Sequence, residues 1–236
     1  MDIKNLLKNS KAYYEDNDFY EIFSIAEDAE NKVSEYLKNV SNDKVVLDAG
    51  CGTGKFLNIL EENSKKYIGI DLSEKQLERA KIKSKKNNSE FICSNLSNIN
   101  LESNSVDLIV SSWVLGTITD LDERNKCLNE LKRILKTNGM IILIENDSNS
   151  EFEELRGRTK DNRTKDYNNW ILSNNFSIEK RIDTFFLFNN LEQAKKCFNV
   201  IYGDTVSSRI KDKRIEHKII IFKYKKTDGV NVRVSN

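Results

Sequence analysis

The chain of 236 residues contains no proline, one histidine and four cysteines. Cys51, Cys93, Cys127 and Cys197 form no C-x-x-C pair, and with a single histidine they do not match the spacing of a zinc site. The formal net charge is only +1, so no overall field favours nucleic acid or an anionic membrane surface. The sequence therefore predicts no metal site and makes nucleic acid an unlikely partner.

Long apolar runs are also absent. The longest, such as Met140–Ile144 and Ile219–Phe222, have the length of a strand, whereas a membrane-spanning helix needs about 20 apolar residues. Met1–Ser10 lacks the charged-then-apolar pattern of a secretory leader. We therefore expect no membrane span, a cytoplasmic location and one large domain.

The most informative stretch is Val45–Phe56, an apolar run followed by glycines at the alternate positions Gly50, Gly52 and Gly54. A second apolar run ends at Asp71, 17 residues after Gly54. Glycine can adopt a positive φ and lets the backbone approach a ligand closely. A carboxylate at the end of the next strand can accept hydrogen bonds from ribose hydroxyls. The pattern predicts a nucleotide-like ligand at the strand ends of a parallel sheet.

The spacing of the glycines distinguishes between two classes of cofactor. A dinucleotide-binding G-x-G-x-x-G fingerprint needs a third glycine at position 55, where this chain has Lys55. The pattern D-x-G-x-G-x-G instead holds from Asp48 to Gly54. This departure disfavours a nicotinamide-dependent dehydrogenase.

Asp48–Phe56 resembles the first signature of the class I S-adenosylmethionine-dependent methyltransferases, and Gly69–Ser73 resembles the second. The likeness covers about residues 40–146, and its branch of closest resemblance includes quinone-biosynthesis and natural-product methyltransferases. It continues in order through four further segments, 91–95, 104–110, 128–136 and 139–145.

Apolar segments of strand length alternate with segments of helical periodicity. This alternation predicts an α/β fold: a Rossmann-like, seven-stranded, mostly parallel sheet with helices on both faces and an antiparallel edge strand. We expect strands at 44–48, 66–70, 90–93, 106–111, 139–145, 178–187 and 215–224. We expect helices at 54–63, 74–86 (capped by Ser73), 122–136 (ended by Asn138-Gly139), 164–173, 190–202 and 204–211.

We expect a single methyltransferase domain over residues 1–236, divided into four segments. Residues 1–40 form an N-terminal helical lid, and residues 41–146 form the cofactor-binding core. Residues 147–225 carry substrate-side insertions and the edge hairpin, and residues 226–236 form a polar tail.

The resemblance implies which residues surround S-adenosylmethionine, whose product is S-adenosylhomocysteine. Asp71 would accept two hydrogen bonds from the ribose hydroxyls, and Leu72 would lie against the adenine. Asn95 stands where the family usually has an aspartate, and its carbonyl can still accept a bond from the adenine amino group. The full cofactor-binding set implied is Asp48, Gly50, Cys51, Gly52, Gly54, Asp71, Leu72, Asn95, Leu96, Ser111 and Ser112.

Three aromatic residues are candidates for the substrate pocket or the lid. Trp113 follows the fourth strand, and an aromatic face there could stabilise a cationic methyl donor. Tyr13 and Tyr14 lie on the expected N-terminal helix. Aromatic residues at such positions also serve as ordinary core packing. His217 is expected to be half-buried on an edge strand, far from the glycines, and no acid–base group stands out, so the catalytic residue is unknown.

The stretch Arg156–Arg181 is rich in arginine and lysine. It either holds a phosphate or carboxylate of the substrate or forms a solvated surface. We predict methyl transfer from S-adenosylmethionine to an unidentified small-molecule acceptor, driven by proximity and alignment. Two alternatives stay open: an RNA (tRNA or rRNA) methyltransferase, and a non-catalytic S-adenosylmethionine-binding regulatory protein. Neither the acceptor nor the oligomeric state follows from the sequence.

Overall fold

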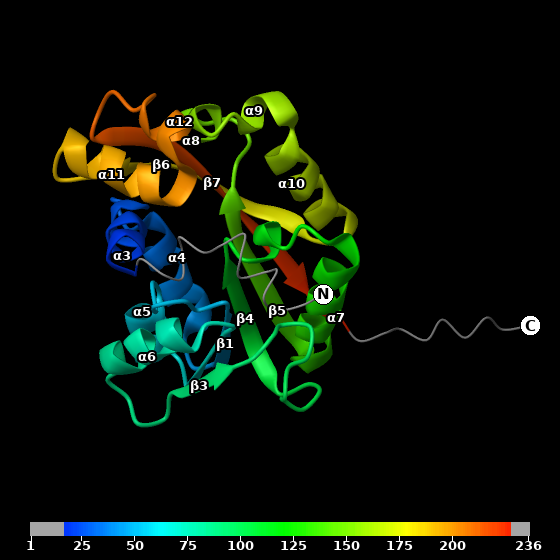
Figure 1. Cartoon of the computed structure of the whole chain (residues 1–236). Helices are drawn as coiled ribbons and strands as arrows, with labels where there is room; N and C mark the ends of the chain where they lie inside the picture. Colours follow the sequence, from blue (N-terminus) through cyan, green and yellow to red (C-terminus); the bar gives the residue numbers. More distant parts are fainter. Residues whose placement is uncertain (1–16, 228–236) are drawn as a thin grey trace, which may run out of the picture.

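A computed structural model describes residues 17–227 of the chain. The strands are β1 Val45–Ala49, β2 Lys66–Asp71, β3 Glu90–Cys93, β4 Val106–Ser112, β5 Leu135–Asn146, β6 Ser177–Leu187 and β7 Arg214–Lys225. They form one sheet in the order β3-β2-β1-β4-β5-β7-β6 (Figure 1). β1 to β5 pair in parallel, whereas β7 is antiparallel to both β5 and β6. This confirms the predicted sheet, with β6 at the edge beside the antiparallel β7.

The order of the strands reverses at β1. The chain runs outward from β1 through β2 to β3, and then crosses back to place β4 on the other side of β1. At such a switch point the loops that follow the two neighbouring strands diverge, which leaves a crevice at their carboxyl ends. The topology therefore places a ligand site beyond the ends of β1 and β4.

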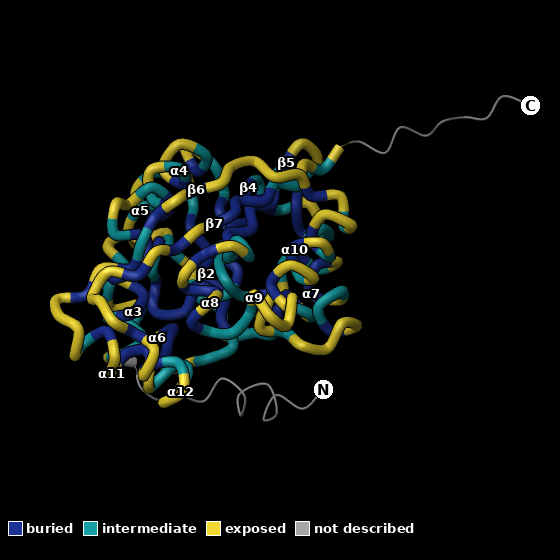
Figure 2. Tube along the Cα trace, turned by 90° about the horizontal axis from the view of Figure 1, so that it is seen from above, coloured by how far each residue is buried: buried dark blue, intermediate teal, exposed yellow. Residues whose placement is uncertain are grey.

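Helices cover both faces of the sheet (Figure 1). On one face α4 (Lys32–Ser41) and α5 (Leu57–Asn63) bury apolar side chains against β1 and β4. On the other face α7 (Leu121–Ile134) and α10 (Arg163–Ser173) do the same. Because parallel strands are buried on both faces, β4 is apolar at successive positions. Figure 2 shows the buried positions running through the strands, with exposed positions on the outer sides of the helices.

A third apolar cluster lies where β6 ends and β7 begins, next to the carboxyl end of β5. It is rich in phenylalanine and joins helices from both ends of the described chain to the sheet. These helices are α3 (Asn17–Ala26), α8 (Glu151–Leu155), α11 (Leu191–Tyr202) and α12 (Asp204–Ser207). The N-terminal helix α3 is thereby fixed near the carboxyl end of β5.

Helix α6 (Glu74–Lys83) begins at its predicted cap. Ser73 Oγ accepts a hydrogen bond from the N–H of Gln76 at 3.3 Å. The helix ends three residues earlier than predicted, because the N–H of Lys85 and the hydroxyl of Ser84 turn to the Glu61 carboxylate. No helix among residues 17–227 is both long enough and apolar enough to cross a membrane.

Two further predicted helix boundaries are wrong, also because the backbone forms hydrogen bonds outside the helix. α5 begins at Leu57 rather than at residue 54, because the N–H of Gly54 closes a turn onto the Cys51 carbonyl at 2.9 Å. The helix predicted to run to residue 136 ends at Ile134, and β5 starts at once. Asn138-Gly139 lies inside this strand, where its register with β4 shifts.

The region after β5 differs most from prediction. The short helices α8 and α9 (Arg158–Asp161) were not foreseen, and α12 stops at Ser207 instead of residue 211. The predicted helical insertion between the last two strands is confirmed by α11 and α12. Short helices give little periodicity to read in a sequence, so their existence follows from tertiary packing.

Substitution of Gly50 tests how tightly the loop after β1 packs against the segment after β4. Its φ is +80°, and a Cβ there would lie 2.3 Å from Val114 Cγ2. We expect Gly50→Ala to lower the free energy of unfolding by about 3 kcal/mol, combining backbone strain of about 1–2 kcal/mol with overpacking of about 1–3 kcal/mol. Urea unfolding measures this loss.

Gly157→Ala is the matched control, because Gly157 has a φ of +73° but no heavy atom within 4 Å of a built Cβ. It should show the strain cost alone. Introducing Gly50→Ala into a Val114→Ala background should reduce the loss toward the strain cost, because it removes the two Val114 carbons nearest to the new Cβ. An equal loss from Gly50→Ala in both backgrounds would show that Val114 is not the limiting contact.

Candidate functional site

The loop between β1 and α5, residues 50–56, is called the glycine loop and is hydrogen-bonded to the end of β2. The N–H groups of Gly50 and Cys51 both donate to the Ile70 carbonyl, at 2.7 and 3.0 Å. The N–H of Gly52 donates to Asp71 Oδ2, and Asp71 Oδ1 accepts from the N–H of the residue that caps α6, each at 2.9 Å. Asp71 is 8% exposed, and burial raises its pKa despite these bonds. Each carboxylate oxygen keeps a second lone pair for a ligand.

Asp48 and Cys51 lie beneath this loop. Asp48 accepts a hydrogen bond from the Tyr67 hydroxyl at 3.1 Å, and burial, assisted by the charge of Asp71, raises its pKa to about 7. Cys51 Sγ would lie 3.0 Å from a Cβ on Gly69, so it packs closely against the backbone of β2. Burial and the two aspartates raise the pKa of the Cys51 thiol well above its usual range. A reactive thiolate is thereby disfavoured.

Two polar side chains from other helices approach the glycines. A Cβ on Gly52 would lie 2.9 Å from Gln76 Oε1 and 3.7 Å from the Tyr20 hydroxyl. Tyr20 belongs to α3 and Gln76 to α6, so both helices reach the loop. Tyr13 and Tyr14, the tyrosines predicted from the sequence for this role, lie outside the described residues. Tyr20 was missed because its helix carries several aromatic residues and only the fold shows which one reaches the glycines.

At the end of β4 the predicted residues have separate roles. Ser111 is fully buried, and its hydroxyl donates to the Ala49 carbonyl at 3.0 Å, which ties β4 to β1. Ser112 is half-buried and is paired with Ile144 of β5. After β4 come Trp113 and a short 3₁₀ helix at Leu115–Thr117.

Trp113 already has a cation on its ring. It adopts a φ of +54°, and its indole N–H donates to Asn146 Oδ1 at 2.8 Å. The ammonium of Lys55 lies 4.5 Å from the ring centroid, and the Phe56 ring stacks on it at 6.4 Å. The aromatic face predicted to meet a cationic methyl donor is thus next to a lysine of the glycine loop.

Asn95 lies in a turn with both ends of its amide engaged. Its Oδ1 accepts from the N–H of Ser97 at 3.1 Å, and its Nδ2 donates to Glu123 Oε1 at 3.2 Å. A carboxylate from α7, that of Glu123, therefore lies beside Asn95. Leu96 is buried and Leu72 is half-buried. A contact of these residues with adenine stays a prediction.

Three buried or half-buried polar side chains link the glycine loop to the end of α3 and to β7. Glu27 Oε2 lies 2.5 Å from the Lys55 ammonium, and Glu27 Oε1 lies 3.2 Å from His217 Nε2. Burial alone would raise the pKa of Glu27, but Lys55 and His217 outweigh it and hold the pKa below its usual value. The interpretation of His217 as half-buried is wrong, because α3 and α8 cover β7 there and leave it fully buried.

A buried acid–base pair lies at the end of β5, and the sequence analysis missed it. The Tyr167 hydroxyl donates to Glu145 Oε1 at 2.7 Å. Burial raises the pKa of Glu145 to about 8, although Tyr167 and Arg124 favour its charged form. The Tyr167 ring lies 3.0 Å from where a Cβ on Gly116 would stand. The signal in the sequence is Glu145 at the end of an apolar strand, because a carboxylate buried at such a place has a shifted pKa.

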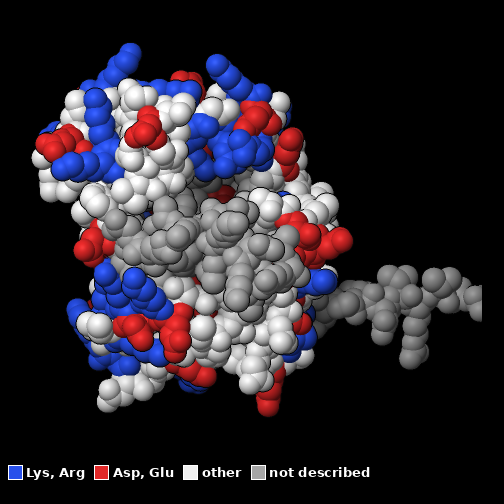
Figure 3. Space-filling model, viewed as in Figure 1, with Lys and Arg blue, Asp and Glu red and all other residues white. Residues whose placement is uncertain are grey.

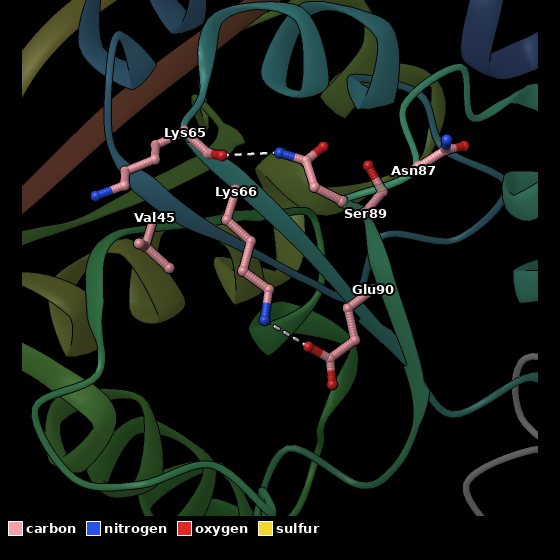
Figure 4. A pocket seen from close by; sticks show the side chains of 7 residues that line it. Val45, Lys65, Lys66, Asn87, Ser89 and Glu90 are labelled. Carbon is pink, nitrogen blue, oxygen red and sulfur yellow. Dashed lines mark hydrogen bonds and ion pairs between the residues drawn. The ribbon is translucent and has the colours of Figure 1, made fainter.

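A hollow of about 510 Å³ lies at the amino ends of the parallel strands, away from the glycine loop (Figure 4). It is lined by the amino ends of β1, β2 and β3, and the Lys66–Glu90 ion pair crosses it at 2.8 Å. Because ligands of parallel sheets bind at the carboxyl ends of the strands, we place the site at the glycine loop instead. Within residues 17–227 no three His, Cys, Asp or Glu side chains group as metal ligands.

Comparison with known proteins identifies the same segment. Residues 47–143 match the family model described as a methyltransferase domain. The chain is 34% identical over 120 residues to the ubiquinone/menaquinone biosynthesis C-methyltransferase UbiE of Campylobacter jejuni, which covers 48% of each chain. It is 31% identical over 112 residues to a tRNA (carboxymethyluridine(34)-5-O)-methyltransferase of Arabidopsis thaliana, covering 48% of this chain and 26% of that one.

The chain thus aligns with about half or less of the length of these curated relatives. A solved structure described as an S-adenosylmethionine-dependent methyltransferase, possible histamine N-methyltransferase, from Thermotoga maritima has a similar fold. It is 18% identical, with a TM-score of 0.60 over 92% of this chain and 100% of that one.

Glu145 makes the stability of the fold depend on pH in a defined direction. Its pKa is raised from 4.5 to about 8, so the folded chain holds a proton that the unfolded chain releases between these values. Stability contributed by this group is full below about pH 4.5 and falls by about 1.4 kcal/mol per unit as pH rises toward 8. Glu145→Gln cannot ionise and should lose this slope.

Urea unfolding of wild type and Glu145→Gln at several pH values between 4.5 and 8 measures the difference. Glu154→Gln, which removes an exposed carboxylate on α8, is the control and should follow the wild type. A constant difference between wild type and Glu145→Gln across this range would show that Glu145 titrates normally.

Proposed function

We propose that this chain binds S-adenosylmethionine at its glycine loop and transfers the methyl group to a small-molecule acceptor, because residues 47–143 match the family model described as a methyltransferase domain. The observation that carries the proposal is the hydrogen bonding of the glycine loop to Asp71 and Ile70 at the carboxyl ends of β1 and β2. Both parts of the pattern read in the sequence meet there.

The loop suits a ligand without a phosphate group. Phosphate-binding loops present free N–H groups and the start of a helix to the ligand. Here the N–H groups of Gly50, Cys51, Gly52 and Gly54 all donate within the protein. The following helix α5 has only seven residues and begins after Phe56. S-adenosylmethionine, a nucleoside without phosphate, agrees with this arrangement better than a dinucleotide does.

The side chains around the loop also fit this cofactor. The Asp71 carboxylate has lone pairs available for two ribose hydroxyls. The hydroxyl of Tyr20 and the amide of Gln76 converge on Gly52, where polar atoms of the ribose or methionine moiety need partners. When bound, S-adenosylmethionine supplies a methyl group on a sulfonium whose leaving group is a neutral thioether.

The residues of the chain then have two tasks. The first is to align the acceptor with the donor and to exclude water, which provides much of the rate of such a displacement. We assign this task to α3, Trp113 and the segments after β5. The second is to remove a proton from an acceptor that does not lose it readily. We assign this to Glu145, whose raised pKa of about 8 leaves a basic carboxylate within reach of neutral pH.

An RNA acceptor is the alternative that one observation favours, because the matched Arabidopsis thaliana relative is described as a tRNA methyltransferase. The net charge of +1 weighs against it, since RNA-binding proteins rely on an excess of cationic side chains. Incubation with S-adenosylmethionine labelled in its methyl group, and with either tRNA or a small-molecule extract, tests this choice. Label that becomes insoluble in acid only with tRNA would favour the alternative.

Asp71→Ala should weaken the binding of S-adenosylmethionine by about 100-fold or more, because two hydrogen bonds to a charged acceptor contribute about 1.5–3 kcal/mol each. Isothermal titration calorimetry measures this affinity. Glu90→Ala is the matched control, since it removes an exposed carboxylate at the other edge of the sheet and should leave the affinity unchanged.

Asp71 also holds the glycine loop, so the thermal unfolding midpoint of each variant must be measured beside the titration. Asp71→Asn keeps the size of the side chain and serves if Asp71→Ala does not fold. Wild-type protein that binds no S-adenosylmethionine, or a folded Asp71 variant with unchanged affinity, would refute the proposal.

A further inference from the structure

A short basic segment follows β5. Residues 156–165 contain five lysine and arginine side chains and one acidic side chain, in a chain whose net charge is only +1. Figure 3 shows lysine and arginine side chains gathered near α8 and α9 on this face of the molecule. This segment is therefore one of the locally basic parts of the chain.

The segment lies at the edge of the sheet where the acceptor must enter. α8 starts shortly after Asn146, the last residue of β5, and the carboxyl end of β5 lies beside that of β4. The Arg209 guanidinium donates to the Leu155 carbonyl at 2.8 Å, which joins the loop after α12 to the end of α8. The basic segment is thus part of the substrate side of the fold.

A buried carboxylate fixes the geometry of this segment. Glu153 is fully buried, and its Oε1 accepts from the Arg156 guanidinium at 2.8 Å. Its Oε2 accepts from the hydroxyl of Thr164 on α10. Burying a carboxylate is costly unless it is paired, and both oxygens are paired here. Glu153 therefore holds α8, Arg156 and α10 together, unlike a freely solvated charged surface.

Arg158 is the arginine of this segment that has no such partner among the described residues. It is half-buried, and within residues 17–227 it forms no hydrogen bond or ion pair. Arg156 is taken by Glu153, and Arg163 is paired with Asp161. Burial, and then repulsion from Arg156 and Arg163, lower the pKa of Arg158, although the carboxylates of Glu153 and Asp161 act in the opposite direction. A guanidinium held beside two others and partly out of water gains most from an anion.

We propose that Arg158, supported by Arg156, binds an oxyanion group, a carboxylate or a phosphate, on the methyl acceptor. The inference rests on the proposed function, and it narrows the acceptor to an anionic small molecule. A guanidinium presents parallel N–H groups that match two oxygens of a carboxylate or phosphate. One unpaired guanidinium suits one such group, whereas an RNA backbone needs a row of cationic contacts.

Calorimetric titration with inorganic phosphate and with succinate, at constant ionic strength set by sodium chloride, tests the site. Wild type should bind at least one of the two probes, and the stronger probe tells which oxyanion the site prefers. Arg158→Gln should weaken this binding about 10-fold or more, since the lost bonds are charge-assisted. Arg158→Lys keeps the charge but loses the paired N–H groups, so its affinity for the probe should lie between those of wild type and Arg158→Gln.

Lys160→Gln is the matched control, because Lys160 is exposed in the same segment and should affect binding little. Equal weakening by Arg158→Gln and Lys160→Gln would reveal a diffuse cationic surface and overturn the proposal. Absence of binding to either probe would overturn it too. Strongly salt-dependent binding of a single-stranded RNA, weakened equally by both variants, would also overturn the proposal and would indicate an RNA acceptor.

Titration with S-adenosylmethionine on the same samples separates this inference from the proposed function. Binding of S-adenosylmethionine without binding of either oxyanion would refute only the anionic acceptor. Oxyanion binding that depends on Arg158, in protein that does not bind S-adenosylmethionine, would refute the proposed function and leave an anion site of another kind.

Discussion

The hydrogen bond from the Gly52 N–H to the Asp71 carboxylate is the contact on which the candidate site depends. It joins the loop after β1 to the end of β2, and the two neighbouring N–H groups bond to the Ile70 carbonyl. These N–H groups donate within the protein, so they are not available to bind a phosphate group. The Asp71 carboxylate keeps lone pairs that can accept hydrogen bonds from hydroxyl groups of a ligand. The close packing of Gly50 on Val114 then sets the distance between the loop and the end of β4.

Three buried glutamates each join separate elements of the fold. Glu27 connects α3 to the glycine loop through Lys55, Glu145 connects β5 to α10 through Tyr167, and Glu153 connects α8 to α10. Each carboxylate costs free energy to bury, and each has a partner that reduces this cost. They differ in electrostatics, because a cation faces Glu27 while a neutral hydroxyl faces Glu145. That difference explains why the pKa of Glu27 is lowered and that of Glu145 is raised.

Most of the sheet could be predicted because its signals are local. Apolar runs of strand length, the Ser73 cap and the spacing of the glycines all lie within a few residues of one another in the sequence. The boundaries that failed depend on distant partners. Asn138-Gly139 has the composition of a helix stop, yet residues on both sides of it pair with β4, and that pairing continues the strand. The short helix α8 depends in the same way on the contacts that Glu153 makes with Arg156 and with Thr164 of α10.

The sequence by itself determined the class of fold and the place of the glycine loop and Asp71, because a turn that needs positive φ and a carboxylate at a strand end are properties of short segments. Only the tertiary structure decided which side chains meet there. It brought Tyr20 to Gly52, buried His217 beside Glu27, paired Glu145 with Tyr167 and left Arg158 unpaired. These partners lie far apart in the chain, so their burial and charge follow from packing alone.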